Sequence, residues 1–289
     1  MQASEFIVFY YQGVKLSHYL TFREVQQKFT NDDRMKPVTI YLKEANFKQF
    51  SARQIKEHFN MLYLRTDTTF YDTRITKQRI EFEREKLRKL KEVYQVSVDK
   101  TQNCRFFVRD FMEYIKKVLQ LQLNVCKVFQ EERIMIREKG FASGRIEGMI
   151  IQRIEGIPRT LFTLMVTEPG SLPLAAAGED LEIQLLQALL PMQCLNNQYR
   201  EELKRTYDIA SEFDEELMNN KVYGVVTDGT TWIFLQYEQQ YSSVTTRIVA
   251  QHTVEVKTFF LSLHEVVKTT INLCSDLIYN RSKPITETR

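Results

Sequence analysis

Residues 222–237, VYGVVTDGTTWIFLQY, consist of two apolar runs separated by Asp228-Gly229. Asp-Gly between apolar runs is the strongest short-range signal for a β-hairpin, because a two-residue type I′ turn needs positive φ at both central positions. The second predicted strand is apolar on both faces, with Trp232 and Phe234 on one and Ile233, Leu235 and Tyr237 on the other. Such a hairpin indicates central strands of a sheet that is covered on two sides.

The composition is ordinary for a soluble globular protein. The chain has 289 residues, of which 43% are hydrophobic and 27% are charged. Its net charge of +3 comes from 40 basic and 37 acidic residues. This balance does not indicate a nucleic-acid binder, and such a function would need a local basic patch.

Several classes of site and location are disfavoured by absent motifs. The four cysteines lie far apart without a C-x-x-C pair, and the four histidines form no metal-binding motif. The sequence has no phosphate-binding glycine loop and no nucleophile elbow. No apolar window of about 18 residues exists and the start of the chain does not resemble a signal peptide. We therefore expect thiols in a reducing compartment, no membrane span, and a cytoplasmic or nuclear location.

The first 70 residues have the element order of a small α+β unit. Strands are predicted over 5–11, 14–20 and 38–42, and capping boxes predict helices over 21–29 and 51–64. Hairpin, helix and strand in this order are typical of a β-grasp, ubiquitin-like domain, so we predict such a domain over 1–70.

Residues 71–100 are predicted to form a charged connecting helix, amphipathic over 74–98. Its basic cluster at 84–89 could contact phosphate. The competing interpretation, a solvated helix face with i,i+4 ion pairs, is favoured. Together with the N-terminal unit, this helix suggests contacts with other proteins.

From residue 101 to 289 the pattern predicts one larger domain. The expected order begins with a helix over 105–131, a strand over 132–137 and a hairpin of 145–153 with 160–167. A helix from about residue 179, which Pro191 ends or kinks, and another over 198–219 follow. The opening hairpin, an edge strand within 244–256 and a helix over 258–279 complete the order. This order predicts an α+β or α/β fold, in which a mixed β-sheet is flanked by helices on both faces.

Two carboxylates are expected at one end of this sheet. Glu147 opens the strand 145–153, and Glu168 ends the strand 160–167. Paired carboxylates at neighbouring strand ends can hold Mg²⁺ for phosphodiester hydrolysis, because Mg²⁺ prefers oxygen ligands and keeps several waters. Such a site also needs a cation to stabilise the charge that develops on phosphate.

The segments GRIEG (144–148), MVTEP (165–169) and VYGVVTDGTTWIFLQY resemble the PD-(D/E)XK nuclease-like superfamily. They are particularly similar to the nuclease-like domains of Crinkler-type proteins and related restriction-endonuclease-like domains, over about residues 105–279. The resemblance implies a restriction-endonuclease-like core, and a ubiquitin-like N-terminal domain fits the same layout.

The resemblance also implies roles for single residues. Glu147 matches the metal-binding aspartate with one extra methylene, and Glu168 matches the second carboxylate. Gln184 and Gln187 fall where helix glutamines approach the site. Glu113 matches an accessory acid, although an exposed helical glutamate is the favoured interpretation.

The main departure from the superfamily pattern follows Glu168. The expected lysine is missing from Glu168-Pro169-Gly170, and neither proline nor glycine supplies a charge. Arg145, Arg159 or Lys204 would have to replace it.

These observations favour a catalytically degenerate nuclease-fold protein, a pseudoenzyme that acts as a binding or assembly module in protein or nucleoprotein complexes. An active Mg²⁺-dependent DNA or RNA endonuclease with a displaced lysine or arginine is the alternative. A third hypothesis is a structural protein in which both carboxylates are solvated. We expect protein partners, with nucleic acid as a further candidate, no membrane, and no cofactor unless the site is active and takes Mg²⁺.

Overall fold

The computed structural model describes most of the chain, namely residues 8–11, 14–15, 41–43, 45–61, 63–98, 104–125, 128–138, 142–154, 156–167, 172, 179–207, 220–240, 243–255 and 257–279.

A small antiparallel sheet near the start has the order β2-β1-β3, formed by Val8–Tyr11 (β1), Val14–Lys15 (β2) and Tyr41–Lys43 (β3). The predicted helix at 21–29 lies outside the described residues. The ubiquitin-like assignment therefore stays a prediction.

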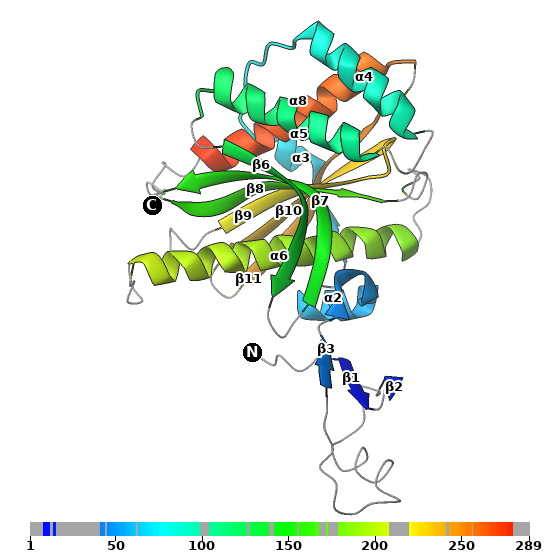
Figure 1. Cartoon of the computed structure of the whole chain (residues 1–289), viewed down its shortest axis with the longest axis vertical. Coiled ribbons are helices and arrows are strands. Elements are labelled where there is room, and N and C mark those ends of the chain that lie inside the picture. Colours follow the sequence, from blue (N-terminus) through cyan, green and yellow to red (C-terminus); the bar gives the residue numbers. More distant parts are fainter. Residues whose placement is uncertain are drawn as a thin grey trace, which may run out of the picture.

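The body of the molecule is an eight-stranded mixed sheet, which confirms the predicted mixed sheet flanked by helices (Figure 1). Its order is β4-β7-β8-β9-β10-β11-β5, and β6 also pairs with β7. The strands are Ala45–Asn46 (β4), Arg65–Thr66 (β5), Val128–Glu138 (β6), Ala142–Ile154 (β7), Ile157–Val166 (β8), Asn220–Thr227 (β9), Thr231–Gln240 (β10) and Ser243–Thr253 (β11). The pairs β4–β7, β8–β9 and β5–β11 are parallel, and β6–β7, β7–β8, β9–β10 and β10–β11 are antiparallel.

Helices cover both faces of this sheet. The short 3₁₀ helix η1 (Phe47–Gln49), α2 (Ala52–His58) and α6 (Glu179–Tyr207) lie on one side, and α3 (Thr68–Arg74), α4 (Arg84–Val98), α5 (Cys104–Leu121) and α8 (Phe259–Tyr279) lie on the other (Figure 1). Among the helices of the described ranges, none combines the length and hydrophobicity needed to cross a bilayer.

The β9–β10 hairpin lies at the centre of the sheet, as its sequence predicts. Trp232 and Phe234 enter the core beneath α5 and α8, whereas Ile233, Leu235 and Tyr237 enter the core that contains α6. The Trp232 ring lies 5.2 Å from the ring of Phe111 on α5, measured between centroids. Full burial of each large apolar side chain contributes roughly 1.5–3 kcal/mol, so this hairpin anchors both layers.

The predicted two-residue type I′ turn is wrong. The strand pairing closes at Thr227 and Trp232, so the connection is longer than two residues. Of the two residues Asp228 and Gly229, only Gly229 has positive φ, at 92°, whereas a type I′ turn requires positive φ at both. Asp228 Oδ1 instead accepts hydrogen bonds from the backbone N–H groups of Thr230 and Thr231. The aspartate side chain therefore organises the turn.

Several predicted helix boundaries are also wrong. The helix expected over 105–131 ends at Leu121, and Asn124, with a φ of 55°, reverses the chain before β6. The helix expected over 74–98 begins only at Arg84. The helix was expected to end or kink at Pro191, and an end there is wrong, since α6 continues through it. A proline inside a helix costs about 3 kcal/mol or more, and the buried apolar side chains on both sides of Pro191 offset that cost.

The strands β4 and β5 come from the range 1–70, which was predicted to form a separate unit. Both pair with the large sheet, β4 with β7 and β5 with β11. The pairing with β5 also means that β11, the predicted edge strand, has a neighbour on each side. The boundaries at residues 70 and 100 stay predictions, but part of the N-terminal range helps to build the candidate site.

Candidate functional site

Strand β7 changes neighbours along its length. It pairs with β8 from Gly148 to Ile154, and with β4 at Ala142 and Ser143. We call residues 144–147 of β7, which lie between these two pairings, the strand fork. The fork opens at the carboxyl end of β8, beside the parallel strand β9. In open α/β sheets, this end of adjacent strands is where binding sites usually form.

Glu147 is the acidic side chain of the fork. Its Oε2 accepts a hydrogen bond from the backbone N–H of Val166, at 3.0 Å. The regular β7–β8 pairing has ended at Gly148 and Leu164, so the carboxylate supplies an acceptor to the last residue of β8. Burial raises the pKa of Glu147, although the bond from Val166 and the charges of Lys48 and Arg145 oppose this effect.

Lys48, which the sequence reasoning missed, is a cation of the fork. It lies in η1, directly after β4, and the Asn46 side chain accepts a hydrogen bond from its backbone N–H at 3.0 Å. The neighbouring Phe47 ring is buried against Gly144, where a Cβ would overlap it. From the opposite side, Gln187 Nε2 of α6 donates to the carbonyl oxygens of Lys48, at 3.2 Å, and Phe50, at 3.0 Å. The backbone N–H and the carbonyl oxygen of Lys48 are therefore both hydrogen-bonded.

The cations predicted to replace the missing lysine lie in different places. Arg145 is exposed at the fork, and its charge lowers the pKa of Glu147. Arg159 is buried and donates from Nη1 to the carbonyl oxygen of Leu277 in α8, at 3.0 Å. Lys204 follows Leu203, which packs against Ile157 at the opposite end of β8. The structure therefore brings only the first of these three predicted cations to Glu147.

Asp228 is a second carboxylate at the same end of the sheet, and the sequence reasoning treated it only as a turn residue. It is 4% exposed and follows the last residue of β9. Besides the two bonds of its Oδ1 to the hairpin loop, its Oδ2 accepts from the backbone N–H of Leu172, at 3.2 Å. Both oxygens of this carboxylate are thus occupied by backbone donors.

The remaining predicted residues are less informative. Glu168, Pro169 and Gly170 lie outside the described residues, so the predicted pairing of Glu168 with Glu147 stays a prediction. Gln184 lies on α6 one turn before Gln187. Glu113 is exposed on α5 and lines a groove with α4. Within the described part of the chain, no three histidine, cysteine or acidic side chains are grouped closely enough to hold a metal ion.

A larger polar cluster lies near the opposite ends of the strands, beneath α8, and the sequence reasoning missed it. We call it the α8 ion cluster; its members are Lys221, Tyr223, Gln236, Glu238, Arg247 and Asp276. The Tyr223 hydroxyl donates to Asp276 Oδ2 at 2.8 Å, and Gln236 Nε2 donates to Glu238 Oε2 at 2.7 Å. Lys221 Nζ lies 4.0 Å from Glu238 Oε1 and 3.9 Å from Asp276 Oδ2.

The outer edge of this cluster is closed by Arg247. Its Nη1 lies 3.1 Å from Asp67 Oδ2, at the start of α3, and its Nη2 lies 4.0 Å from Glu238 Oε2. Burial, and then the charge of Asp276, raises the pKa of Tyr223, so this hydroxyl remains a proton donor. The only sequence signal for the cluster is a set of polar residues at alternating positions in strands that are otherwise apolar.

In comparisons with known proteins, no family model matches this sequence and no curated protein is significantly similar to it.

Proposed function

We propose that this chain is a nuclease-fold protein without catalytic activity, which serves as a binding or assembly module in protein or nucleoprotein complexes. Its partners would be proteins, with nucleic acid as a further candidate, and its location would be the cytoplasm or the nucleus. The proposal rests on two points. Residues 105–279 resemble the PD-(D/E)XK superfamily, and the Glu147 side chain accepts a backbone hydrogen bond at the end of β8.

The observation that carries this proposal is the hydrogen bond between Glu147 Oε2 and the backbone of Val166. One oxygen of the Glu147 carboxyl group is engaged by this bond, and burial of the group favours its protonated, neutral form. A magnesium ligand needs the ionised form with oxygens directed at the ion. The sequence Glu168-Pro169-Gly170 supports the same conclusion, because it lacks the lysine that the resemblance requires.

A cleavage assay tests the proposal directly. The full chain is incubated with plasmid DNA, single-stranded DNA and RNA in Mg²⁺ or Mn²⁺, beside Glu147→Gln and Glu168→Gln. Glu131→Gln is the control, because Glu131 is exposed on β6. We expect no metal-dependent cleavage by the wild-type chain above that of the Glu147→Gln and Glu168→Gln variants. Cleavage that both substitutions abolish and the control retains would refute the proposal.

The second candidate function, an active Mg²⁺-dependent nuclease with a displaced cation, is favoured by one specific observation. Lys48 and Arg145 both act electrostatically on the Glu147 carboxyl, and η1 holds the backbone of Lys48 in place. A cation beside the carboxylate could orient a water and stabilise charge on phosphate, the role left empty at Gly170.

This candidate predicts a different mutational pattern. If cleavage is detected, Lys48→Met or Arg145→Met should lower its rate by about 100-fold, the usual loss on removing one transition-state donor. The exposed Arg53→Met on α2 should leave the rate within about twofold. Rates unaffected by both fork substitutions would exclude these residues as the displaced cation.

A further inference from the structure

Residues of α4 and α5 line an open groove with a cavity volume of ≈ 240 Å³. Both helices lie on the face of the sheet opposite α6 (Figure 1). Its lining includes Lys86, Lys89 and Leu90 from α4 and Glu113, Tyr114 and Lys117 from α5. Since a water molecule occupies about 30 Å³ in the liquid, the cavity has room for a small solute of several non-hydrogen atoms.

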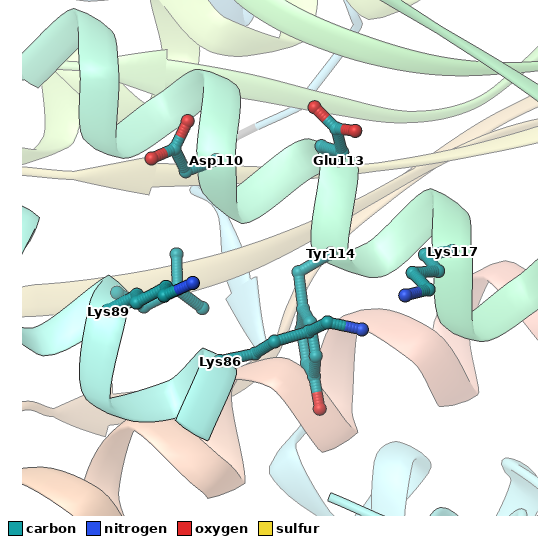
Figure 2. Close-up of a pocket in the computed structure, with 7 residues that line it drawn as sticks. Lys86, Lys89, Asp110, Glu113, Tyr114 and Lys117 are labelled. Carbon is teal, nitrogen blue, oxygen red and sulfur yellow. The ribbon is translucent and has the colours of Figure 1, made fainter. Parts of the chain in front are cut away.

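Two ammonium groups in the groove share one carboxylate. Lys86 Nζ lies 2.5 Å from Glu83 Oε2, while Lys117 Nζ lies 3.9 Å from Glu83 Oε1. Figure 2 shows the two ammonium groups turned toward one another beside the ring of Tyr114. The contact with Lys86 lowers the pKa of Lys117, and attraction by Glu83 opposes this only in part. Glu83 is therefore the one carboxylate, among the described residues, for which contacts with both ammonium groups are observed.

Tyr114 adds an unused donor to the same place. The residue is 5% exposed, and its hydroxyl has no hydrogen-bond acceptor among the described residues. Burial raises the pKa of Tyr114, and an interaction with the backbone of Glu83 opposes this effect only in part, so the hydroxyl stays protonated and keeps its proton to donate. A buried hydroxyl without an acceptor is costly unless a ligand or water accepts from it.

The rest of the groove is suited to an organic group that carries hydroxyls. Leu90 is 3% exposed and forms an apolar wall with the ring of Tyr114. The carboxylates of Asp110 and Glu113 also line the groove, and in Figure 2 they lie away from the pair of ammonium groups. Carboxylates accept hydrogen bonds from hydroxyl groups, and lysine ammonium groups bind phosphate as point charges.

We infer that the α4–α5 groove is a binding site for a small phosphate ester of a hydroxylated compound. The phosphate lies between Lys86 and Lys117 and accepts a hydrogen bond from Tyr114. The organic part lies over Leu90 and the tyrosine ring, with its hydroxyls directed to Asp110 and Glu113. A phosphate dianion carries one negative charge for each ammonium group, whereas Glu83 carries a single charge and lies 3.9 Å from Lys117. The groove shares no residue with the strand fork, so the inference does not depend on the proposed function.

Isothermal titration calorimetry of the full chain tests this site, with ribose 5-phosphate, inorganic phosphate and ribose as probes at constant ionic strength. We expect ribose 5-phosphate to bind at least tenfold more tightly than either fragment. Equal binding of inorganic phosphate would overturn the assignment to an ester. Absence of binding by both phosphate probes would overturn the site.

Matched variants separate the groove from general attraction to a basic surface. Lys86→Gln and Lys117→Gln should each weaken ribose 5-phosphate binding about tenfold or more. Lys116→Gln should not, because this neighbour on α5 removes the same charge but does not line the groove. Equal weakening by all three would overturn the inference.

Glu83→Gln gives a change of opposite sign. Because Glu83 is the resident anion of the two lysines, its neutralisation should strengthen binding several-fold. Thermal melting of each variant establishes that it is folded. Weaker binding by a folded Glu83→Gln protein would mean that the two lysines only stabilise the packing of α4 against α5. That result would refute the site.

Discussion

The strand fork with the adjacent Asp228 and the α8 ion cluster both place acidic side chains near strand ends of the same sheet, yet their partners differ. Glu147 and Asp228 accept hydrogen bonds from backbone N–H groups. In the α8 ion cluster, Asp276 and Glu238 face side chains that include Lys221. The first arrangement fixes the path of the chain at the end of β8 and in the hairpin loop. The second holds α8 against the sheet.

An acidic residue at a strand end is therefore not by itself a sign of a metal site. The oxygens of a carboxylate that accept hydrogen bonds from the backbone are less available to a metal ion. A buried carboxylate whose charge is neutralised by cations becomes an uncompensated charge when a cation is removed. Removal of Asp276, a buried member of the α8 ion cluster, should therefore have the largest effect. Loss of Asp228 should have the next largest effect, and neutralisation of Glu147 in the fork should have the smallest.

The largest effect is expected for Asp276→Ala. Asp276 is 6% exposed, accepts from Tyr223 and lies near Lys221, so its removal leaves both without this partner. Breaking a buried charged pair costs about 3–5 kcal/mol, and we expect a loss of that size in the free energy of unfolding from urea denaturation. Asp276→Asn, which keeps an oxygen for Tyr223, is the control and should lose less. A loss below about 1 kcal/mol for the alanine variant would contradict the comparison.

Asp228→Ala should have the next largest effect. It removes the acceptor of three backbone N–H groups, those of Leu172, Thr230 and Thr231. Each hydrogen bond to a charged acceptor contributes about 1.5–3 kcal/mol, but part is regained as water reaches the loop, so we expect a net loss of about 3 kcal/mol in urea unfolding. Asp228→Asn should retain more than half of the wild-type contribution. Equal losses in both variants would show that the charge, and not the acceptor geometry, stabilises the loop.

Lys221→Met is expected to have a smaller effect. The lysine side chain is 30% exposed and lies about 4 Å from both carboxylates, at 4.0 Å and 3.9 Å. Partly exposed pairs of this length contribute up to about 1 kcal/mol, and salt screens them. The loss in unfolding free energy should therefore shrink between low salt and about 1 M NaCl. A loss that grows with salt would indicate a packing effect of the lysine stem.

The smallest effect, with the opposite sign, is expected for Glu147→Gln. Burial raises the folded-state pKa of Glu147 above its ordinary value of 4.5, so the folded state penalises the ionised form. This penalty is absent below the ordinary pKa and appears as the pH rises through the folded-state pKa. Glutamine keeps an oxygen for Val166 and cannot ionise. The variant should therefore be more stable than the wild type at pH 8 and equal to it near pH 4, as measured by thermal melting. A variant less stable at pH 8 would show that the ionised carboxylate is needed.

Much of the fold could be predicted because the relevant signals are local. The two apolar runs in residues 222–237 predict a hairpin that is apolar on both faces. The structure confirms that this hairpin lies at the centre of the sheet. Ser51 with Gln54 predicts a capping box, and both of its hydrogen bonds are present at the start of α2. The turn at Asp228-Gly229 was placed correctly but given the wrong type, because the Asp228 side chain accepts hydrogen bonds from the backbone of Thr230 and Thr231 and so organises a longer connection.

The candidate site was predicted only in part. Glu147 and Arg145 were named from their place in the sequence, and both lie at the fork. Lys48 was missed because it is almost 100 residues away in the chain, in a range assigned to another unit. Arg159 was named as a substitute cation, but its strand position places it beneath α8, where it donates to Leu277.

By itself, the sequence determined the order of elements in the larger domain, the two-sided hairpin and the absence of a lysine after Glu168, because periodicity, capping and composition act over a few residues. The tertiary structure alone decided that β4 and η1 close the fork beside Glu147, that α6 passes through Pro191, and that six polar side chains meet beneath α8. These features depend on burial and on contacts between residues distant in sequence. No local pattern specifies which distant segment will pack against a given strand or helix and bury its side chains.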